Sequence, residues 1–411
     1  MPFSEDDNDD LSGNKRLLRK VLWERLKPDE WPIRIADLPS ETVLVGGSIR
    51  DALLDRLSEK PDLDFVVREK AIEFAKNLAK KIQCKCVVLD EERDIARLAV
   101  DGWTLDFARQ MGKNVEDDLF RRDFRLNAIG LNLNPEGQLI DPTGGINDLR
   151  GKIIVAINEK NLIEDPLRIL RGFRLMAELD FSLEEKTLNF FCAHAKLLFN
   201  VAPERIKYEI LKIVHSKFAD PIILFLKKSE FLGDWKSNDG NLVKGFYPIK
   251  ESIFSPHELA IAIPLVRSVY LFSEEGLSEL CFSKREINRC RTLRLWQNKN
   301  DGLAFRTLSE DDRFQLHKDL EKDLPALMLS LSAKDQNIWL RRWRDPCDPL
   351  FHPSSPLDGL LLQKATGIPQ GPSLGELMSH LAKEKAFGRV STRNEAFDAA
   401  RYWTQRNQPF L

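Results

Sequence analysis

The stretch Val43-Leu44-Val45-Gly46-Gly47-Ser48-Ile49-Arg50-Asp51-Ala52-Leu53-Leu54 runs from a short apolar strand through two glycines into a helix. Glycines at such a junction let the backbone turn closely, and the amides at the start of the helix can then meet an anion. Arg50, one turn into the helix, adds a positive charge. The stretch predicts a phosphate cradle at Gly46 and Gly47, with an ordinary strand-to-helix turn as the alternative that the glycines alone favour.

Short apolar runs continue from Val43 to about Ile157 and predict further strands. Helical spacing between them predicts helices over Ser48–Leu57 and Ala71–Ile82. After Asn158 the apolar residues recur with a period of about 3.6, so the remainder is expected to be mainly helical. The pattern predicts an α/β or α+β module followed by helices. The predicted strands are Val43–Val45, Leu63–Val67, Cys86–Leu89, Leu105–Ala108, Ala128–Leu133 and Ile153–Ala156.

Composition limits the classes of protein that this chain can be. Its 411 residues predict roughly two to four structural units. Lys plus Arg total 62 against 64 for Asp plus Glu, so attraction for nucleic acid has to come from local basic faces. Six cysteines and six histidines lack metal-ligand spacing and indicate reduced thiols. A proline-rich segment, Asp345–Pro356, is the best candidate for an internal linker.

The longest apolar stretch and the acidic first residues of the sequence bear on localisation. The longest apolar stretch, Leu259–Phe272, is interrupted by Pro264 and Arg267, so no membrane span is expected. The acidic first dozen residues predict disorder and are the opposite of a cationic secretory signal. They lead into an apolar helical stripe that ends before Pro28. A cytoplasmic protein is therefore expected.

Two carboxylates occupy alternate positions of the second predicted strand, Asp62-Leu63-Asp64-Phe65-Val66-Val67. Alternate strand residues share a face, so Asp62 and Asp64 repel each other unless a cation lies between them. The pair predicts a divalent metal site, and two solvated acids at a strand start are the alternative. Asp106 joins them if an antiparallel neighbour brings its strand alongside. Three such acids suit two magnesium ions in phosphoryl or nucleotidyl transfer.

Two later segments combine acids with arginines. In Glu116-Asp117-Asp118-Leu119-Phe120-Arg121-Arg122-Asp123-Phe124-Arg125-Leu126-Asn127-Ala128, the i,i+4 spacing predicts a charged helix face. That account leaves Arg125 and Asn127 unexplained, and an arginine here is also a candidate partner for a triphosphate. The turn Asp141-Pro142-Thr143-Gly144-Gly145, with Asp148 bracing the next segment, is assigned no chemistry.

The second of these segments is Glu164-Asp165-Pro166-Leu167-Arg168-Ile169-Leu170-Arg171. Pro166 fits the first position of a helix, which makes Asp165 the expected N-cap. Asp165 and Arg168 also form an edge complementary to a base. The acid accepts from the exocyclic amine of cytosine or adenine and the arginine donates to the ring nitrogen, which excludes uracil and guanine.

Taken in order, these motifs resemble the bacterial class II tRNA nucleotidyltransferase and poly(A) polymerase family. The resemblance covers about residues 40 to 215, with a weaker echo at Gly367–Gly375. The motifs are Gly46-Gly47-x-x-Arg50-Asp51, Asp62-x-Asp64, Arg121-Arg122-Asp123-Phe124-x-x-Asn127-Ala128, Asp141-Pro142-x-Gly144-Gly145, Glu164-Asp165-x-x-Arg168 and Glu204-Arg205-Ile206.

The resemblance implies an α+β fold, in which a nucleotidyltransferase-type mixed β-sheet head precedes an all-helical neck, body and tail. The implied divisions are 1–36 (disordered stretch and helix), 37–157 (catalytic head), 158–220 (neck, base templating), 221–350 (body) and 351–411 (tail, tRNA binding).

The resemblance also implies a metal-dependent site. By it, Asp62 and Asp64 bind Mg²⁺, and Asp106 helps to activate the RNA 3′-hydroxyl. The implied partners are tRNA, with CTP and ATP as substrates, and the sequence does not set the oligomeric state. The residues implied in nucleotide binding are Gly46, Gly47, Arg50, Arg122, Asp123, Asn127, Asp165, Arg168 and Arg171.

The product is the open question within this resemblance. Family members that build the whole C-C-A end carry a long flexible loop between the third carboxylate and the Arg-Arg-Asp motif, whereas here only residues 107–120 connect them. This shortened form resembles enzymes that add only the two cytidines. A poly(A) polymerase and an inactive RNA-binding relic are the alternatives. The first usually carries an extra basic extension, and the second gains nothing from a repulsive acid pair.

Overall fold

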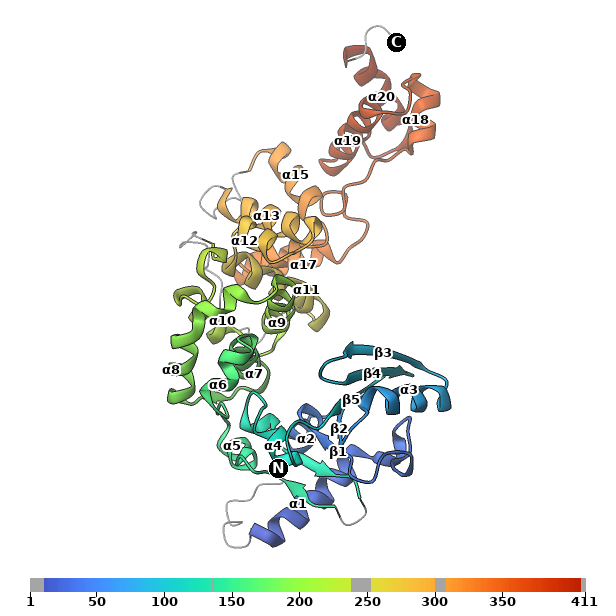
Figure 1. Cartoon of the computed structure of the whole chain (residues 1–411). Helices are drawn as coiled ribbons and strands as arrows, with labels where there is room; N and C mark the ends of the chain where they lie inside the picture. Colours follow the sequence, from blue (N-terminus) through green and yellow to red (C-terminus); the bar gives the residue numbers. More distant parts are fainter. Residues whose placement is uncertain (1–10, 135–136, 238–252, 300–307, 408–411) are drawn as a thin grey trace. The chain divides into compact units, whose positions relative to one another are not determined.

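The computed structural model describes residues 11–134, 137–237, 253–299 and 308–407. The chain divides into two compact units, Met1–Glu209 and Ile210–Leu411. The first unit contains a mixed β-sheet, and the second is helical (Figure 1). The expected disorder at the acidic start falls mainly on residues 1–10, which lie outside the described residues.

A seven-stranded sheet organises the first unit, in the order β3-β4-β5-β2-β1-β6-β7. Neighbouring strands are antiparallel except for β2 and β5, which are parallel. The mixed sheet agrees with the expected fold class, but β4 is a strand that sequence reasoning missed. The strands are β1 (Val43–Val45), β2 (Asp62–Val67), β3 (Lys85–Asp90), β4 (Ile95–Val100), β5 (Trp103–Arg109), β6 (Gly130–Asn132) and β7 (Leu139–Ile140).

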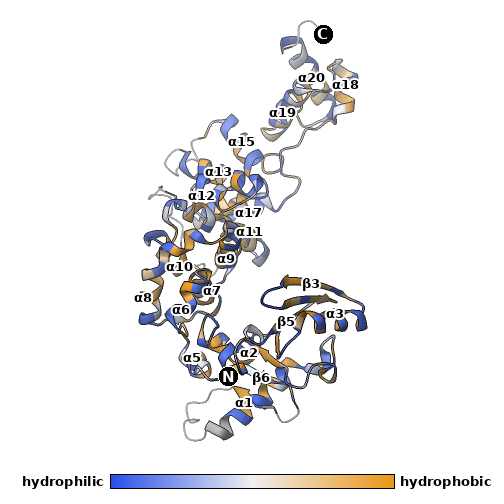
Figure 2. Ribbon diagram, in the orientation of Figure 1, coloured by the Kyte–Doolittle hydropathy of each residue, from blue (hydrophilic) through white to orange (hydrophobic). Residues whose placement is uncertain are grey.

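One face of the sheet carries the apolar core of the head. Phe65 of β2 stacks on Phe107 of β5 with ring centroids 5.0 Å apart, and Phe74 meets Phe107 edge-on at 5.2 Å. Phe74 belongs to α3 (Ala71–Lys81), so this helix covers the face. Because side chains alternate along a strand, Asp62, Asp64 and Asp106 lie on the opposite face. Figure 2 shows hydrophobic residues along the strands of the head and also along helices of the second unit.

The helices of the first unit frame the sheet and then replace it. The helix predicted to end before Pro28 ends at Leu26, as expected, whereas the one predicted over Ser48–Leu57 ends at Leu53. The charged helix expected through Arg122 ends at Leu119. The helices are α1 (Leu11–Leu26), α2 (Gly47–Leu53), α3, α4 (Val115–Leu119), α5 (Gly145–Gly151), α6 (Glu159–Glu164), α7 (Leu167–Leu179), α8 (Glu185–His194) and α9 (Pro203–His215).

The last predicted strand of the head does not join the main sheet. Ile153–Ala156 forms only the short strand β8 (Ile153–Ile154), which pairs in parallel with β9 (Ser182–Leu183). The expectation of wholly helical segments after the head is therefore wrong at this pair. Backbone hydrogen bonds explain it, since Ser182 and Glu184 donate their N–H groups to the carbonyls of Lys152 and Ile154. Short 3-10 helices lie at Pro28–Glu30, Ile35–Asp37, Arg125–Asn127, Ala195–Asn200 and Gly233–Trp235.

The second unit is built from helices, and its C-terminal three pack on a core of their own that includes Leu362, Leu377 and Ala400. The proline-rich segment lacks helix and strand, but Phe351 within it is buried against His317 and Trp339, so it is packed rather than a free linker. Within the described ranges, no helix has the length and apolarity to cross a bilayer. The helices are α10 (Asp220–Lys228), α11 (Pro256–Leu271), α12 (Glu274–Glu279), α13 (Lys284–Asn298), α15 (Glu310–Leu320), α16 (Leu324–Met328), α17 (Ala333–Trp343), α18 (Gly359–Thr366), α19 (Pro372–Ala386) and α20 (Arg393–Asn407).

Candidate active site

The three predicted acids share one face of the sheet. Asp64 of β2 and Asp106 of β5 are register partners, and Asp62 lies two residues before Asp64 on the same side. The predicted antiparallel neighbour is wrong, because the two strands run parallel. In-register residues of parallel neighbours still point to the same face, so the expected grouping of carboxylates is present.

Asp64 is the electrostatic centre of this group. Its burial, together with the negative charges of Asp106 and Asp62, raises the pKa of the Asp64 carboxyl to about 6, although the positive charge of Arg122 acts in the opposite direction. A raised pKa means that the charged form is disfavoured where it stands. A cation between these acids relieves that cost.

Arg97, which the sequence analysis did not single out, binds the third acid, Asp106. Arg97 of β4 is the register partner of Asp106, and its Nε and Nη2 donate to the two carboxylate oxygens at 2.7 Å each. These hydrogen bonds raise the pKa of the Arg97 guanidinium. The available signal was the short, mostly apolar run Ile95-Ala96-Arg97-Leu98-Ala99-Val100, which Arg97 interrupts and the turn residues Asp101-Gly102 end.

The acids provide the right kind of donor for a hard divalent cation. Carboxylate oxygens are the ligands that Mg²⁺ prefers, and Asp62 is exposed while Asp64 is half-buried. Among the described residues, no group of three or more His, Cys, Asp or Glu side chains is arranged as a ready metal site. Asp106 bonds Arg97 instead, so Asp62 and Asp64 are the pair with the better fit.

The predicted glycine turn lies beside Asp64. Gly46 has a φ of +84°, and a Cβ added there would lie 3.0 Å from Asp64 Oδ2 and 3.4 Å from Arg122 Nη1. A side chain at this position would therefore fill the space between the acid and the arginine. The helix α2 that starts at Gly47 is short, so any cradle depends on the arginines around Gly46 as well as on backbone amides.

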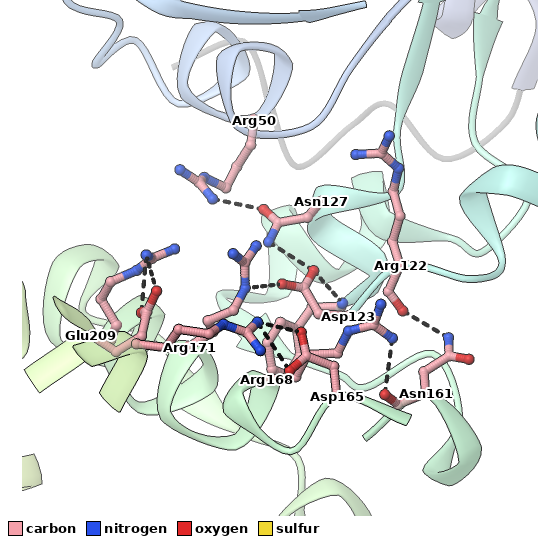
Figure 3. Close-up of polar contacts among 12 residues, drawn as sticks. Arg50, Arg122, Asp123, Asn127, Asn161, Asp165, Arg168, Arg171 and Glu209 are labelled. Carbon is pink, nitrogen blue, oxygen red and sulfur yellow. Dashed lines mark hydrogen bonds and ion pairs between the residues drawn. The ribbon is translucent and has the colours of Figure 1, made fainter. Parts of the chain in front are cut away.

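Four predicted nucleotide-binding residues form one hydrogen-bonded chain (Figure 3). Arg50 Nη1 donates to Asn127 Oδ1 at 2.6 Å, and Asn127 Nδ2 donates to Asp123 Oδ1 at 3.1 Å. Arg171 Nε donates to Asp123 Oδ2 at 2.7 Å. The chain thus connects α2 of the head with α7, and it fixes two guanidinium groups through one buried carboxylate.

The Asp123 carboxylate is strongly held in its charged form. Burial by itself would raise its pKa, but the charge of Arg171 and hydrogen bonds from Asn127 and the Phe124 N–H outweigh it, so the pKa lies well below the usual range. In return, the charge of Asp123 raises the pKa of Arg171. Asp123 is therefore a permanent anion that orders two cations around it.

Asn161 is a second residue that sequence reasoning missed. Its Nδ2 donates to the backbone carbonyls of Phe120 at 2.8 Å and Arg122 at 2.7 Å. The backbone carbonyl of Asn161 accepts from Arg168 Nη1 at 3.0 Å (Figure 3). Asn161 thereby joins the Arg-Arg-Asp segment to the helix that carries Arg168. A buried asparagine in a polar segment, Glu159–Glu164, gave no sequence signal for this role.

Asp165 does not cap a helix. The N-cap of α7 is Pro166, and the cap lacks a side-chain hydrogen bond, so the N-cap prediction is wrong. The Asp165 carboxylate instead accepts from Arg205 Nη2 at 3.2 and 3.1 Å. Asp165 directly follows α6 and has an extended backbone conformation. Burial lowers the pKa of its predicted partner Arg168.

The sequence-predicted residues thus fall into two groups in the first unit. Gly46 and Arg122 lie beside the acids, and the chain from Arg50 to Arg171 leads to the segment with Asp165 and Arg168. The segment between Arg109 and Val115 connects β5 to α4.

Several arginines and lysines of the basic segments in the second unit form ion pairs with acidic residues. These pairs are Arg289–Asp323, Arg291–Glu274, Lys299–Asp312, Arg342–Asp348 and Arg344–Glu258.

Known proteins are similar to this chain over most of its length. Residues 42–155 match the model of the poly A polymerase head domain, and residues 180–233 match a probable RNA and SrmB-binding site of polymerase A. A CC-adding tRNA nucleotidyltransferase of Synechocystis sp. is 30% identical over 89% of this chain and 94% of its own. Another, of Thermus thermophilus, is also 30% identical over 89% of this chain and 94% of its own.

The fold also has a counterpart among solved structures. The crystal structure of the Bacillus stearothermophilus CCA-adding enzyme in complex with CTP superposes with a TM-score of 0.67 at 19% identity, over 95% of this chain and 98% of that one. This likeness extends to the mixed sheet followed by helices. With relatives of this similarity along almost its whole length, the chain belongs to the class II tRNA nucleotidyltransferase and poly(A) polymerase family.

Proposed function

We propose that this protein is a metal-dependent nucleotidyltransferase that adds cytidine nucleotides to the 3′ end of tRNA. The observation that carries the proposal is the grouping of Asp62, Asp64 and Asp106 on one sheet face, beside Gly46 and Arg122. Carboxylates facing an arginine-lined turn suit a reaction that moves a nucleotide and releases pyrophosphate. The relatives named above support tRNA as the acceptor.

The reaction assigns a task to each group of residues. The RNA 3′-hydroxyl oxygen bonds to the α-phosphorus, the bond from that phosphorus to the bridging oxygen breaks, and pyrophosphate leaves with the electron pair. Mg²⁺ bound at Asp62 and Asp64 would supply charge stabilisation for this displacement. Asp106 orients the attacking hydroxyl and takes its proton as the new oxygen–phosphorus bond forms. Arg122 and Arg50, near the glycine turn, hold the phosphates.

Base choice falls to Asp165 and Arg168. The carboxylate accepts from the exocyclic amine of cytosine, and the guanidinium donates to the ring nitrogen and carbonyl of the same edge. Arg168 is anchored by the Asn161 carbonyl and Asp165 by Arg205, so both side chains are oriented before a nucleotide arrives. Pre-oriented donors and acceptors discriminate between bases better than mobile ones.

The connection between β5 and α4 favours two cytidines over a full C-C-A end. Only residues 110–114 lie between Arg109 and Val115. The Met111 N–H donates to Asp118 Oδ1 at 3.0 Å, and the Lys113 N–H donates to Asp117 Oδ2 at 2.8 Å. A connection this short and this strongly bonded to α4 does not supply a mobile lever that resets the base site for adenosine. A poly(A) polymerase and an inactive RNA-binding relic are the alternatives, and a cytoplasmic location goes with the proposed tRNA substrate.

Incubation of the purified protein with tRNA lacking its last three nucleotides, Mg²⁺ and radiolabelled CTP tests the proposal. We expect CMP incorporation with release of pyrophosphate, and loss of both in Asp62→Ala with tRNA binding nearly intact. A poly(A) polymerase would instead use ATP on an unstructured oligoadenylate. Incorporation by Asp62→Ala at the wild-type rate would remove the metal assignment, and a wild-type protein inert toward every nucleotide would support the relic.

A further inference from the structure

One row of side chains crosses the whole sheet through the carboxylates. Each neighbouring pair of strands contributes register partners, so all members of the row lie on the face that carries the acids. Gly130 allows Val43 and Leu119 to pack closely against β6, because a Cβ there would lie 3.0 Å from Val43 and 3.5 Å from Leu119. The row comprises Val87, Arg97, Asp106, Asp64, Val45, Gly130 and Ile140.

The two halves of this face differ in what covers them. On the β1–β6 side, Val45 and Val66 are buried in a cluster with Leu119 of α4. On the β3–β4 side, Val87 is 53% exposed, and Leu89, which lies at a register shift between Val88 and Asp90, is 48% exposed. The side chain of Arg97, between Val87 and the acids in the row, is 45% exposed. We call Val87, Leu89 and Arg97 the β3–β4 platform.

The platform is apolar with a positive border. Lys85 is exposed at the start of β3, and its register partner Ala99 is paired in turn with Thr104, the partner of Asp62. A second row thus leads from a lysine to the first acid. Acidic residues of the hairpin, Glu91 and Glu92, lie beyond the opposite end of β3. The Lys85 charge therefore favours an anionic ligand with an apolar part, whereas the Arg97 charge is offset by Asp106 and Arg97 contributes its remaining N–H donors.

In-line displacement decides on which side of the acids the acceptor lies. The attacking and leaving oxygens lie on opposite sides of the phosphorus. In the proposed function, the leaving pyrophosphate is held near Gly46 and Arg122, on the β1 side of Asp64. The attacking 3′-hydroxyl then approaches from the β5 side, where the sheet continues into β4 and β3.

Arg97 is suited to contact an acceptor phosphate without releasing Asp106. Its Nε and Nη2 each bind one oxygen of that carboxylate. A guanidinium carries five N–H donors, and the two on Nη1 are not used by Asp106. A phosphodiester next to Nη1 would place the following 3′-hydroxyl close to Asp106.

We propose that the β3–β4 platform binds the 3′-terminal unpaired nucleotides of the acceptor RNA, with Val87 and Leu89 against a base and Arg97 against a phosphate. This assignment rests on the proposed function, because that function sets the direction of attack. Every base presents an apolar face, so the contact tolerates any terminal nucleotide. The platform therefore binds the RNA 3′ end before and after each nucleotide is added, while Asp165 and Arg168 select the incoming nucleotide.

Steady-state kinetics on the double variant Val87→Ser/Leu89→Ser tests the platform. We expect the KM for truncated tRNA to rise about 5- to 30-fold, as expected for loss of one base contact. The KM for CTP stays at the wild-type value, which also shows that the head is folded. Leu17→Ser, an equally exposed apolar residue of α1, is the matched control and leaves both KM values unchanged. An unchanged KM for tRNA in the double variant overturns the proposal.

Photocrosslinking separates this proposal from the proposed function. A truncated tRNA with 4-thiouridine as its terminal nucleotide is expected to crosslink to the peptide containing residues 85–99, and the double variant loses this crosslink. If the wild-type protein transfers no nucleotide but gives the crosslink, the proposed function fails and the platform stands. Crosslinks confined to other peptides overturn it. A dimer that the double substitution converts to a monomer, with tRNA kinetics unchanged, assigns the platform to self-association and also overturns it.

Discussion

Arg205 Nη2 donates to both carboxylate oxygens of Asp165, at 3.2 and 3.1 Å. Arg205 belongs to α9 and Asp165 to the end of α6, so the contact fixes an acid on one element from another. Arg168, three residues after Asp165, is fixed independently by the Asn161 carbonyl. The two side chains proposed to read the base are therefore positioned by separate anchors, which can be removed one at a time.

Removal of the first anchor is expected to weaken base choice without weakening phosphate binding. In Arg205→Ala, Asp165 loses its partner and its carboxylate samples several orientations. We expect discrimination between CTP and UTP to fall about tenfold, the scale of one base-reading hydrogen-bonded pair. Competition between the two nucleotides measures this ratio directly. Arg205→Lys keeps a single hydrogen bond and is expected to retain most of the selectivity. Equal selectivity in wild type and Arg205→Ala would show that Asp165 needs no anchor.

Substitution of Arg168, the arginine proposed to contact the base, is expected to lower selectivity among nucleotides more than Arg205→Ala does. Arg168→Ala deletes the donor to the ring nitrogen, so selection among CTP, UTP and GTP should relax more than the binding of the triphosphate weakens. Inhibition by pyrophosphate, which lacks a base, serves as the control and should be unchanged. If Arg168→Ala loses pyrophosphate inhibition but keeps its choice of base, the residue binds phosphate and the templating role is wrong.

The ion pair between the buried Asp123 carboxylate and Arg171, whose side chain is 37% exposed, is expected to stabilise the fold. Asp123→Ala leaves Arg171 and Asn127 without their acceptor, and loss of these hydrogen bonds costs about 2 kcal/mol of unfolding free energy. Urea denaturation measures the loss. Glu24→Ala, which removes a solvent-exposed pair with Lys20, is the control and should cost less than about 1 kcal/mol. Similar losses in both variants would contradict the structural role given to Asp123.

Asp148 is expected to make stability depend on pH. Burial, aided by Asp141 and Glu184 and opposed by Arg125, raises the pKa of its carboxyl to about 6, and its Oδ2 is buried without a hydrogen bond. Between about pH 4 and 6 the folded state then holds more protons than the unfolded state, so this contribution to stability falls as pH rises. Asp148→Asn should remove that slope.

The same variant should gain about 2 kcal/mol of unfolding free energy at pH 7 relative to wild type, because the cost of ionising a buried acid is absent. Denaturation curves at pH 5 and pH 7 report both effects. A loss of stability at pH 7 in Asp148→Asn would mean that the charge is used in the fold.

The sequence predicted the parts of this site that depend on neighbouring residues in the chain. Glycines at a strand end and acids at i and i+2 have local consequences, and the structure places Gly46 beside Asp64 on this basis. The direction of the strand that pairs with β2 depends on the path of the whole head. For this reason Asp106 was expected on an antiparallel neighbour and lies on a parallel one.

Contacts between distant elements explain the remaining differences. Arg97 reaches Asp106 only through β4, whose exposed arginine obscured its strand pattern. Asp165 satisfied the sequence rule for an N-cap, but a bond to Arg205, 40 residues away, replaced the local one. The sequence around a charged residue gives little indication of which distant residue it will contact. The spacing of apolar residues, in contrast, indicates which face of a helix or strand is buried.

The products formed from tRNA lacking its last three nucleotides, with CTP and ATP both present, test the central claim most directly. Sequencing of the 3′ ends over time distinguishes the possibilities. We predict tRNA that gains two cytidines and then stops, because the five-residue connection 110–114 is bonded to α4 and the base site stays set for cytosine. Products ending in C-C-A that form as fast as those ending in C-C would contradict this account.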